Sequence, residues 1–266
     1  MKKSILIILV FVFLLSPFLV AVELSKDEAL IIGKKIWLNE CAGTVEGLTS
    51  WNQGENFGSF GIAHFIWFPQ DVEAPFEESF PNLVAYIKQS GAKIPEWLLL
   101  AKDCPWNSRE EFMAQRESEK MKSLRFFLRD TIALQAQFAA QRLSKALPKM
   151  TATLDPQQTQ HLEKQFRRLA ITKGGTYLLM DYVNFKGEGV KESERYQGEG
   201  WGLQQVLLGM KGSASGAAAL DEFADSSIRV LSRRVELSPP ARKEERWLKG
   251  WMNRCQTYRS DVNSKP

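Results

Sequence analysis

Histidine is scarce in this chain, and its scarcity excludes one broad class of site. Only two histidines occur among 266 residues, His64 and His161, and neither stands at metal-ligand spacing from a cysteine or from the other histidine. Zinc sites draw most of their ligands from these two residue types. We therefore expect no metal centre, and no sequence feature implies an organic cofactor.

Cysteine is too rare for a disulfide scaffold. The chain has Cys41, Cys104 and Cys255, so an oxidising compartment would permit one disulfide and leave one thiol over. The sequence alone does not decide the pair. We favour Cys41 with Cys104, which would tie the first predicted helix to a later turn. A reactive Cys41 is disfavoured, because a carboxylate beside it should raise the pKa of its thiol.

A strong excess of one charge is also missing. The formal net charge is +4 at pH 7, and it falls to +2 without residues 1–21, which hold two lysines and no acidic residue. Nucleic-acid-binding domains usually carry a basic patch or stripe. We therefore expect no nucleic-acid partner.

Long apolar runs are absent except at the N-terminus. The run Ile5–Val20 follows two lysines, contains Pro17 and ends beside the small residue Ala21. This order of charged, apolar and small residues is typical of a secretory signal peptide, and the run is short for a membrane span. We predict cleavage after Ala21, a periplasmic or secreted location and no stable membrane span after signal cleavage. An uncleaved N-terminal anchor is the alternative.

Helical patterns dominate the remaining residues, which are numerous enough for a single domain. Ser25-Lys26-Asp27-Glu28 is a capping box, and the apolar residues behind it recur at helical spacing up to a C-cap near Gly43. Further helices are predicted at residues 81–89, 95–102, 108–147 with a break near 122, 156–174, 175–183, 200–210, 217–234 and 240–258. The predicted fold class is α+β, predominantly α-helical.

The segment 43–68 interrupts the helices with five glycines and no helical periodicity. Residues 59–68 predict one strand, with Phe60, Ile62 and His64 on one face and small residues, beginning with Ser59, on the other. Small residues on a strand face allow another group to approach the backbone closely. We predict a small β-hairpin or meander after the first helix.

Glu40 occupies an unusual position for a carboxylate. It follows Gly33 by seven residues and Ile36 by four, so it lies on the apolar face of the first predicted helix, in its last turn. Burial and the negative end of the helix dipole both disfavour the anion, so we expect a raised pKa. A carboxylic acid that stays protonated near neutral pH is what a glycosidase uses to protonate a leaving-group oxygen.

A second carboxylate would be needed to hold or activate water. Glu55 lies in the polar turn that follows, where a carboxylate should stay ionised, and Glu46 is a weaker candidate. Two acids whose surroundings push their pKa values apart are typical of an acid/base pair.

These features resemble the active-site segment of phage-type lysozymes, in the lysozyme-like superfamily. That family has Glu at a helix end, Asp in a hairpin and then Thr-x-Gly-Ile-Gly-His, where this chain has Ser59-Phe60-Gly61-Ile62-Ala63-His64. The resemblance implies that Glu40 is the catalytic acid and that Ser59 stands at the position of a water-positioning threonine. Glu55 falls near, not on, the position of the aspartate. The segment is a few residues longer than the family pattern, and the resemblance is confined to it.

Two later segments, 181–189 and 196–203, mix glycine, aromatic and polar residues between predicted helices. Such a mixture is typical of a cleft that combines apolar surface with a few polar groups. The substrate-binding residues that we predict are His64, Trp51, Asp181, Asn184, Glu188 and Trp201. Asp181 or Glu188 could replace Glu55 as the second carboxylate. For His64, the alternative is a purely structural role.

The sequence thus predicts a lysozyme-like core with a helical extension in residues 22–266. The predicted activity is that of an exported glycoside hydrolase or lytic enzyme cleaving a cell-wall glycan such as peptidoglycan. Glu40 would be the general acid, and Glu55 and Ser59 would orient or activate a water molecule. Carboxyl groups separated by about 6.5–9.5 Å would give inversion. A chitosanase-like enzyme would need an acidic cleft. The other class that we consider is a non-catalytic exported glycan- or protein-binding protein.

Overall fold

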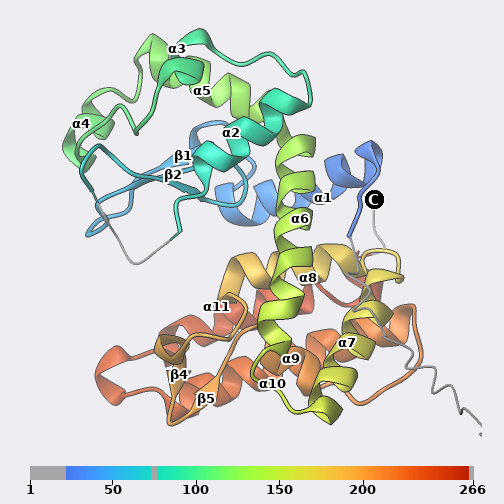
Figure 1. Cartoon of the computed structure of the whole chain (residues 1–266). Helices are drawn as coiled ribbons and strands as arrows, with labels where there is room; N and C mark the ends of the chain where they lie inside the picture. Colours follow the sequence, from blue (N-terminus) through green and yellow to red (C-terminus); the bar gives the residue numbers. More distant parts are fainter. Residues whose placement is uncertain (1–21, 73–76, 264–266) are drawn as a thin grey trace, which may run out of the picture.

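The computed structural model describes residues 22–72 and 77–263 (Figure 1). The predicted signal peptide, residues 1–21, lies outside the described residues. Across the part that is described, no helix combines the length and the apolar character that crossing a membrane requires.

The chain folds mainly into helices joined by two small antiparallel sheets, which confirms the predominantly helical α+β class. The α-helices are α1 (Lys26–Cys41), α2 (Phe80–Gln89), α3 (Glu96–Leu100), α4 (Arg109–Ala114), α5 (Glu119–Asp130), α6 (Ile132–Thr151), α7 (Pro156–Ala170), α8 (Gly175–Lys186), α9 (Leu203–Leu208), α10 (Ala217–Leu237), α11 (Glu245–Gln256) and α12 (Ser260–Asn263). Short 3-10 helices are η1 (Glu46–Leu48), η2 (Glu192–Glu194) and η3 (Pro240–Arg242). One sheet has the order β1 (Thr49–Ser50), β2 (Gly58–Phe60), β3 (Phe65–Trp67), and the other pairs β4 (Arg195–Tyr196) with β5 (Glu199–Gly200).

Helix α6 joins two lobes (Figure 1). The first lobe contains the three-stranded sheet and α2 to α5, and the second contains α7 to α11. Helix α1 packs along α6, and the two backbones approach closely at Gly33. A Cβ at this position would lie 2.6 Å from Cγ2 of Ile132, so only glycine fits there.

The ends of α1 are where the sequence places them. Ser25 caps the N-terminus, with its Oγ accepting from the backbone N of Glu28 at 3.3 Å, and the reciprocal bond completes the predicted capping box. Ala42 takes a left-handed conformation with φ of 53° and ends the helix one residue before Gly43.

The single strand predicted at residues 59–68 is wrong, because the chain reverses in its middle. Gly61 and His64 have positive φ values of 74° and 50°, so β2 and β3 are separated by a tight turn. The side-chain amide of Gln135 holds this turn by accepting from the backbone N of Ile62 at 2.9 Å. The broader prediction of a meander after the first helix is confirmed.

Several helix boundaries also differ from prediction. The long pattern at 108–147 breaks at 115–118 and at 131 rather than near 122, because Ser118 and Thr131 each precede a new helix. The last predicted helix divides into η3 and α11, since Lys243 adopts a positive φ of 50° between them.

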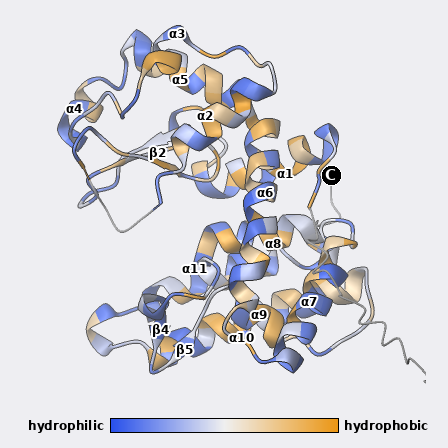
Figure 2. Ribbon diagram, in the orientation of Figure 1, coloured by the Kyte–Doolittle hydropathy of each residue, from blue (hydrophilic) through white to orange (hydrophobic). Residues whose placement is uncertain are grey.

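Aromatic side chains form the centre of each lobe. In the first lobe, Phe80 packs against Phe60 and Trp67, with ring centroids 5.0 and 4.8 Å apart. In the second, Phe223 contacts Tyr182 and Tyr258. Hydrophobic and hydrophilic residues alternate along α1 and α6 (Figure 2), as expected of helices that are buried on one side.

The predicted disulfide between Cys41 and Cys104 is wrong in this structure. All three cysteines are buried free thiols. Each packs within the hydrophobic core instead of facing a second sulfur, and Cys41 Sγ lies 3.8 Å from the carbonyl oxygen of Gly61.

Candidate functional site

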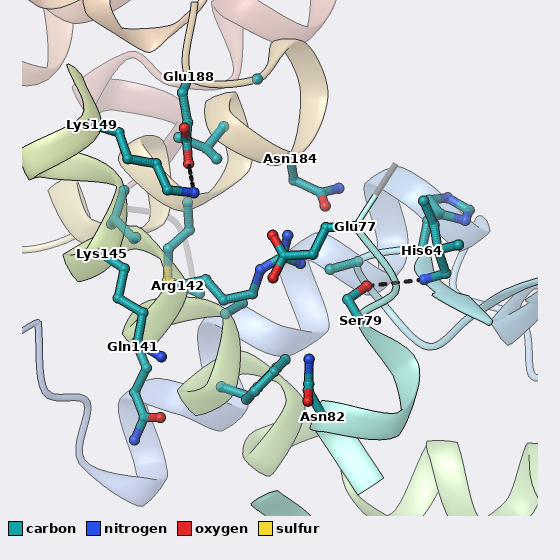
Figure 3. Close-up of a pocket in the computed structure, with 18 of the residues that line it drawn as sticks. His64, Glu77, Ser79, Asn82, Gln141, Arg142, Lys145, Lys149, Asn184 and Glu188 are labelled. Atoms are coloured by element: carbon teal, nitrogen blue, oxygen red, sulfur yellow. Dashed lines mark hydrogen bonds and ion pairs between the residues drawn. The ribbon is translucent and has the colours of Figure 1, made fainter. Parts of the chain in front are cut away.

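A pocket of about 590 Å³ lies between the two lobes (Figure 3). Its walls come from α1, from the turn before β3, from the start of α2, from α6 and from α8 with the loop that follows. The volume falls within the range of about 300–1,000 Å³ that is typical of ligand sites. Polar groups from both lobes therefore face one space that is partly open to solvent.

Glu40, in the last turn of α1, does not itself line this pocket but lies directly behind His64, which does. The side chain of Glu40 is 14% exposed. Oε2 lies 3.5 Å from Nε2 of His64, and Oε1 accepts a hydrogen bond from Nη2 of Arg254 on α11. The carboxylate is thus held from two sides, by a turn of the first lobe and by a helix of the second.

A buried aspartate in turn holds Arg254. Asp181 on α8 is fully buried, and its Oδ2 and Oδ1 accept from Nε and Nη2 of Arg254 at 2.9 and 2.8 Å. Tyr258 donates its hydroxyl to Oδ2 at 2.6 Å, and Asn39 donates its amide to Oδ1 at 3.2 Å. A bidentate pair of this kind fixes both the position and the orientation of the Arg254 guanidinium.

The expected rise in the pKa of Glu40 is wrong. Burial, the largest single effect, does raise the pKa, but the hydrogen bond from His64 and the charge and hydrogen bond of Arg254 together outweigh it. The net result lowers the pKa of Glu40 to about 2. The prediction failed because it considered only the helix, while Arg254 stands 214 residues further along the chain.

His64 connects Glu40 to the pocket. Its side chain is 36% exposed and lines the cavity, and its left-handed backbone lies in the turn that Gly61 makes possible. Ile36, one helical turn before Glu40, lines the same wall. The imidazole is therefore the part of the Glu40–His64 pair that a ligand in the pocket would reach first.

Ser59 lies on β2 behind this wall. It pairs with Ile66 of β3, which lines the pocket, and paired residues of antiparallel strands project to the same face. The Ser59 side chain is nevertheless buried, at 4% exposure. Its predicted role with water would therefore require the ligand or a water molecule to reach below the surface of the sheet.

Glu55 is not brought into the pocket. It lies in the turn between β1 and β2, where its backbone oxygen accepts from the indole Nε1 of Trp51 at 2.8 Å. Trp51 itself is buried and packs against Phe112 on α4. Both residues thus contribute to the structure of the β1–β2 turn.

The later predicted residues divide between the pocket and the core. Asn184 and Glu188 line the pocket, and Oε1 of Glu188 lies 3.6 Å from Nζ of Lys149 on α6. Asp181 reaches the site only through Arg254. Trp201 is buried outside the pocket lining, with the guanidinium of Arg234 4.0 Å from its ring centroid.

Sequence reasoning missed two groups of this site. Arg254 lies on α11 and Tyr258 lies in the turn that follows this helix, and no local pattern distinguishes either from its neighbours. Glu77 precedes α2 and points into the pocket in Figure 3. The one available signal was the need for a partner near Glu40, because buried charges are usually paired.

Neither metal binding nor thiol chemistry is supported at this site. The described residues contain no group of three or more histidine, cysteine, aspartate or glutamate side chains that could hold a metal ion. Burial, with a smaller contribution from the negative charge of Glu40, raises the pKa of the Cys41 thiol to about 12. Such a thiol is a weak nucleophile, because the thiolate is the reactive form.

Comparisons of the chain with protein-family models, with curated proteins and with solved structures give no match.

Proposed function

We propose that this protein is an exported enzyme that cleaves a glycosidic bond of a cell-wall glycan held in the pocket between the lobes. The observation that carries the proposal is the placement of Glu40. It lies near the end of α1, is oriented by Arg254, and contacts the partly exposed His64, which lines the pocket. The order of helix end, small meander and Gly-Ile-Ala-His turn agrees with the lysozyme-like resemblance, which belongs to the same proposal.

The proton for the leaving group comes from the Glu40–His64 pair. When the imidazole is protonated, the pair holds one proton close to the pocket wall. A bound glycan excludes water from the carboxylate, which strengthens the effect of burial and favours the neutral acid. The proton passes to the glycosidic oxygen as its bond to the anomeric carbon breaks.

Water completes the reaction from the other side of the sugar. Its oxygen forms the new bond to the anomeric carbon, and a carboxylate accepts its proton. Glu77, Glu188 and Glu194 are the described acids that line the pocket, and we assign this role to Glu188 or Glu77 in preference to Glu55. Fragment ends with a free reducing sugar would indicate hydrolysis, and anhydro ends would indicate lytic transglycosylation.

The decisive experiment compares the wild-type protein with Glu40→Gln on isolated peptidoglycan, with the released fragments identified by chromatography and mass. Loss of one acid/base group typically lowers the rate by about 10²–10⁴-fold, and we expect this for Glu40→Gln. Glu46→Gln is the matched control, because Glu46 is an exposed carboxylate outside the pocket and should retain full activity. Equal cleavage by Glu40→Gln and the wild type would refute the assigned role.

A second candidate is a glycan-binding protein without catalysis. The observation that favours it is the low pKa of Glu40, since a carboxylate paired with Arg254 can serve stability alone. In that case, the wild type would bind the glycan and release no fragments. Glu40→Gln would then destabilise the fold with little effect on glycan affinity.

A further inference from the structure

Three cations line the pocket from one side of α6. Arg142, Lys145 and Lys149 are separated by three and four residues, so they follow one another along the helix axis. Figure 3 shows them on the α6 side of the pocket, with Asn184 on the opposite side and the side chain of Glu77 extending towards Arg142. Seven residues of α-helix rise by about 10 Å, which is comparable to the length of one disaccharide unit.

The charges of this α6 row are only partly compensated. Lys149 lies 3.6 Å from Glu188, and both side chains are partly exposed. Among the described residues, no acidic side chain lies within ion-pair distance of Arg142 or Lys145. The pocket lining also includes a fourth cation, Lys191, and two further acids, Glu77 and Glu194.

The space beside the row is suited to sugar rings. Phe138 and Met180 supply apolar surface, and Asn82 and Asn184 supply amides that can donate to and accept from hydroxyls. Sites of this composition bind ligands through apolar contact and obtain specificity from a few polar groups. The α6 row is therefore placed at the margin of a surface for neutral sugars, where substituents of a glycan would project.

We propose that the α6 row is a subsite for negatively charged substituents, and that the protein selects an anionic glycan over a neutral or cationic one. This inference rests on the proposed function, because it assumes that the pocket holds a glycan. The guanidinium of Arg142 can bind a carboxylate or phosphate through two hydrogen bonds, while the lysines act as point charges. A chitosan-type glycan would bring ammonium groups towards the same cations and is disfavoured.

Binding of four hexasaccharides to the full-length protein tests the proposal. They are the N-acetylglucosamine hexamer, its carboxymethylated and its phosphorylated derivatives, and the chitosan hexamer, compared by calorimetry at low and high salt. We expect at least one anionic derivative to bind about ten-fold tighter than the neutral hexamer, with an advantage that shrinks as salt screens the charges. The two derivatives distinguish a preference for carboxylate from one for phosphate, and chitosan should bind weakest.

Charge-matched variants locate the effect. Arg142→Gln/Lys145→Gln/Lys149→Gln should abolish the advantage of the anionic glycan and leave affinity for the neutral hexamer unchanged. The control, Lys102→Gln/Lys164→Gln/Lys173→Gln, removes the same charge from exposed residues outside the pocket and should keep the advantage. Equal affinity for neutral and anionic hexamers, an advantage that survives in the row variant, or no binding of any hexamer would each overturn the inference.

Binding and cleavage separate this inference from the function on which it rests. A preference for the anionic hexamer that depends on the row, without fragment release from peptidoglycan, would support the subsite and contradict the proposed cleavage. Fragment release that depends on Glu40, without any anionic preference, would support the cleavage and contradict the subsite.

Discussion

Lys186, at the end of α8, is a cation surrounded by aromatic rings and by other cations. Its Nζ lies 3.5 Å from the ring centroid of Trp251 and 4.1 Å from that of Phe185. Burial is the main cause that lowers the pKa of Lys186 to about 7, and the charges of Arg234 and Arg254 add to it, while Glu244 opposes it. The amine is therefore only partly charged at neutral pH, although it lies near the arginine that holds Glu40.

Replacing Lys186 with methionine should stabilise the protein at low pH. Between pH 7 and about 10.4, the ordinary lysine value, the unfolded chain binds more protons than the folded one, so the stability of the wild type rises with pH through this window. Below pH 7, Lys186 is charged in both states, and the folded protein carries the full cost of burying this charge. We expect Lys186→Met to raise the free energy of unfolding by about 1–3 kcal/mol at pH 6. This net value includes the loss of cation–π contacts worth about 1 kcal/mol.

Urea unfolding at pH 6, 8 and 10 measures this effect. The advantage of Lys186→Met should decline towards pH 10, and the exposed Lys164→Met should show none of this dependence. A variant that is less stable than the wild type by the same amount at every pH would show that the ring contacts outweigh the cost of burying the charge.

At the scale of elements, the turn between β2 and β3 decides where His64 lies. Gly61 has a φ of 74°, and a Cβ there would meet the side-chain oxygen of Gln135 and lie 3.2 Å from Cδ2 of Phe65. Gln135 is itself fixed, because its Nε2 donates to the carbonyl oxygen of Leu128 at 2.6 Å. The side chain that would have to move is therefore the one that holds the turn.

Gly61→Ala should destabilise the fold by about 2–4 kcal/mol, since backbone strain of about 1–3 kcal/mol adds to the displacement of Gln135. Gly54→Ala is the matched control, because Gly54 also has a positive φ, of 86°, but a Cβ there meets nothing within 4 Å. Thermal unfolding of both variants measures the difference, and glycan binding should weaken only for Gly61→Ala. Equal destabilisation by the two variants would show that strain alone matters and that Gln135 yields easily.

Local sequence signals predicted the elements that local chemistry determines. The capping box before α1 and the start of α7 at residue 156 are both present as predicted, because each helix start depends on a cap between residues three positions apart. The β2–β3 turn was mistaken for a continuous strand because alternating apolar residues fit both structures. What distinguishes them is the hydrogen bond from Ile62 to Gln135, which crosses 73 residues of sequence.

At the scale of the whole molecule, the same limit applies to the candidate site. The position of Glu40 on a buried helix face could be predicted, and so could the contribution of Asn184 and Glu188 to the pocket. The charge state of Glu40 could not be predicted, because Arg254 reaches it from the other end of the chain. Glu40 and His64 lie in one short segment, but the charge state of Glu40 depends on a contact with Arg254 in the other lobe.

The pair of Glu40 and Arg254 joins α1 to α11, so its protonation should govern acid stability. The pKa of Glu40 is lowered to about 2, so the contribution is present above the ordinary glutamate pKa and is lost as the pH falls from about 4.5 to 2. A shift of this size corresponds to at most about 3 kcal/mol. Glu40→Gln should therefore lower the free energy of unfolding by about 1–3 kcal/mol at pH 7.

Denaturant unfolding of the wild type and Glu40→Gln at pH 7, 4.5, 3 and 2 follows this loss. The difference between the two proteins should shrink as the pH falls and be small at pH 2, because protonated Glu40 resembles the amide, whereas Glu46→Gln should match the wild type at pH 7. A constant difference between the wild type and Glu40→Gln down to pH 2 would mean that the carboxylate contributes through packing and not through its charge. Convergence would instead show that the pair between α1 and α11 depends on the ionised carboxylate of Glu40.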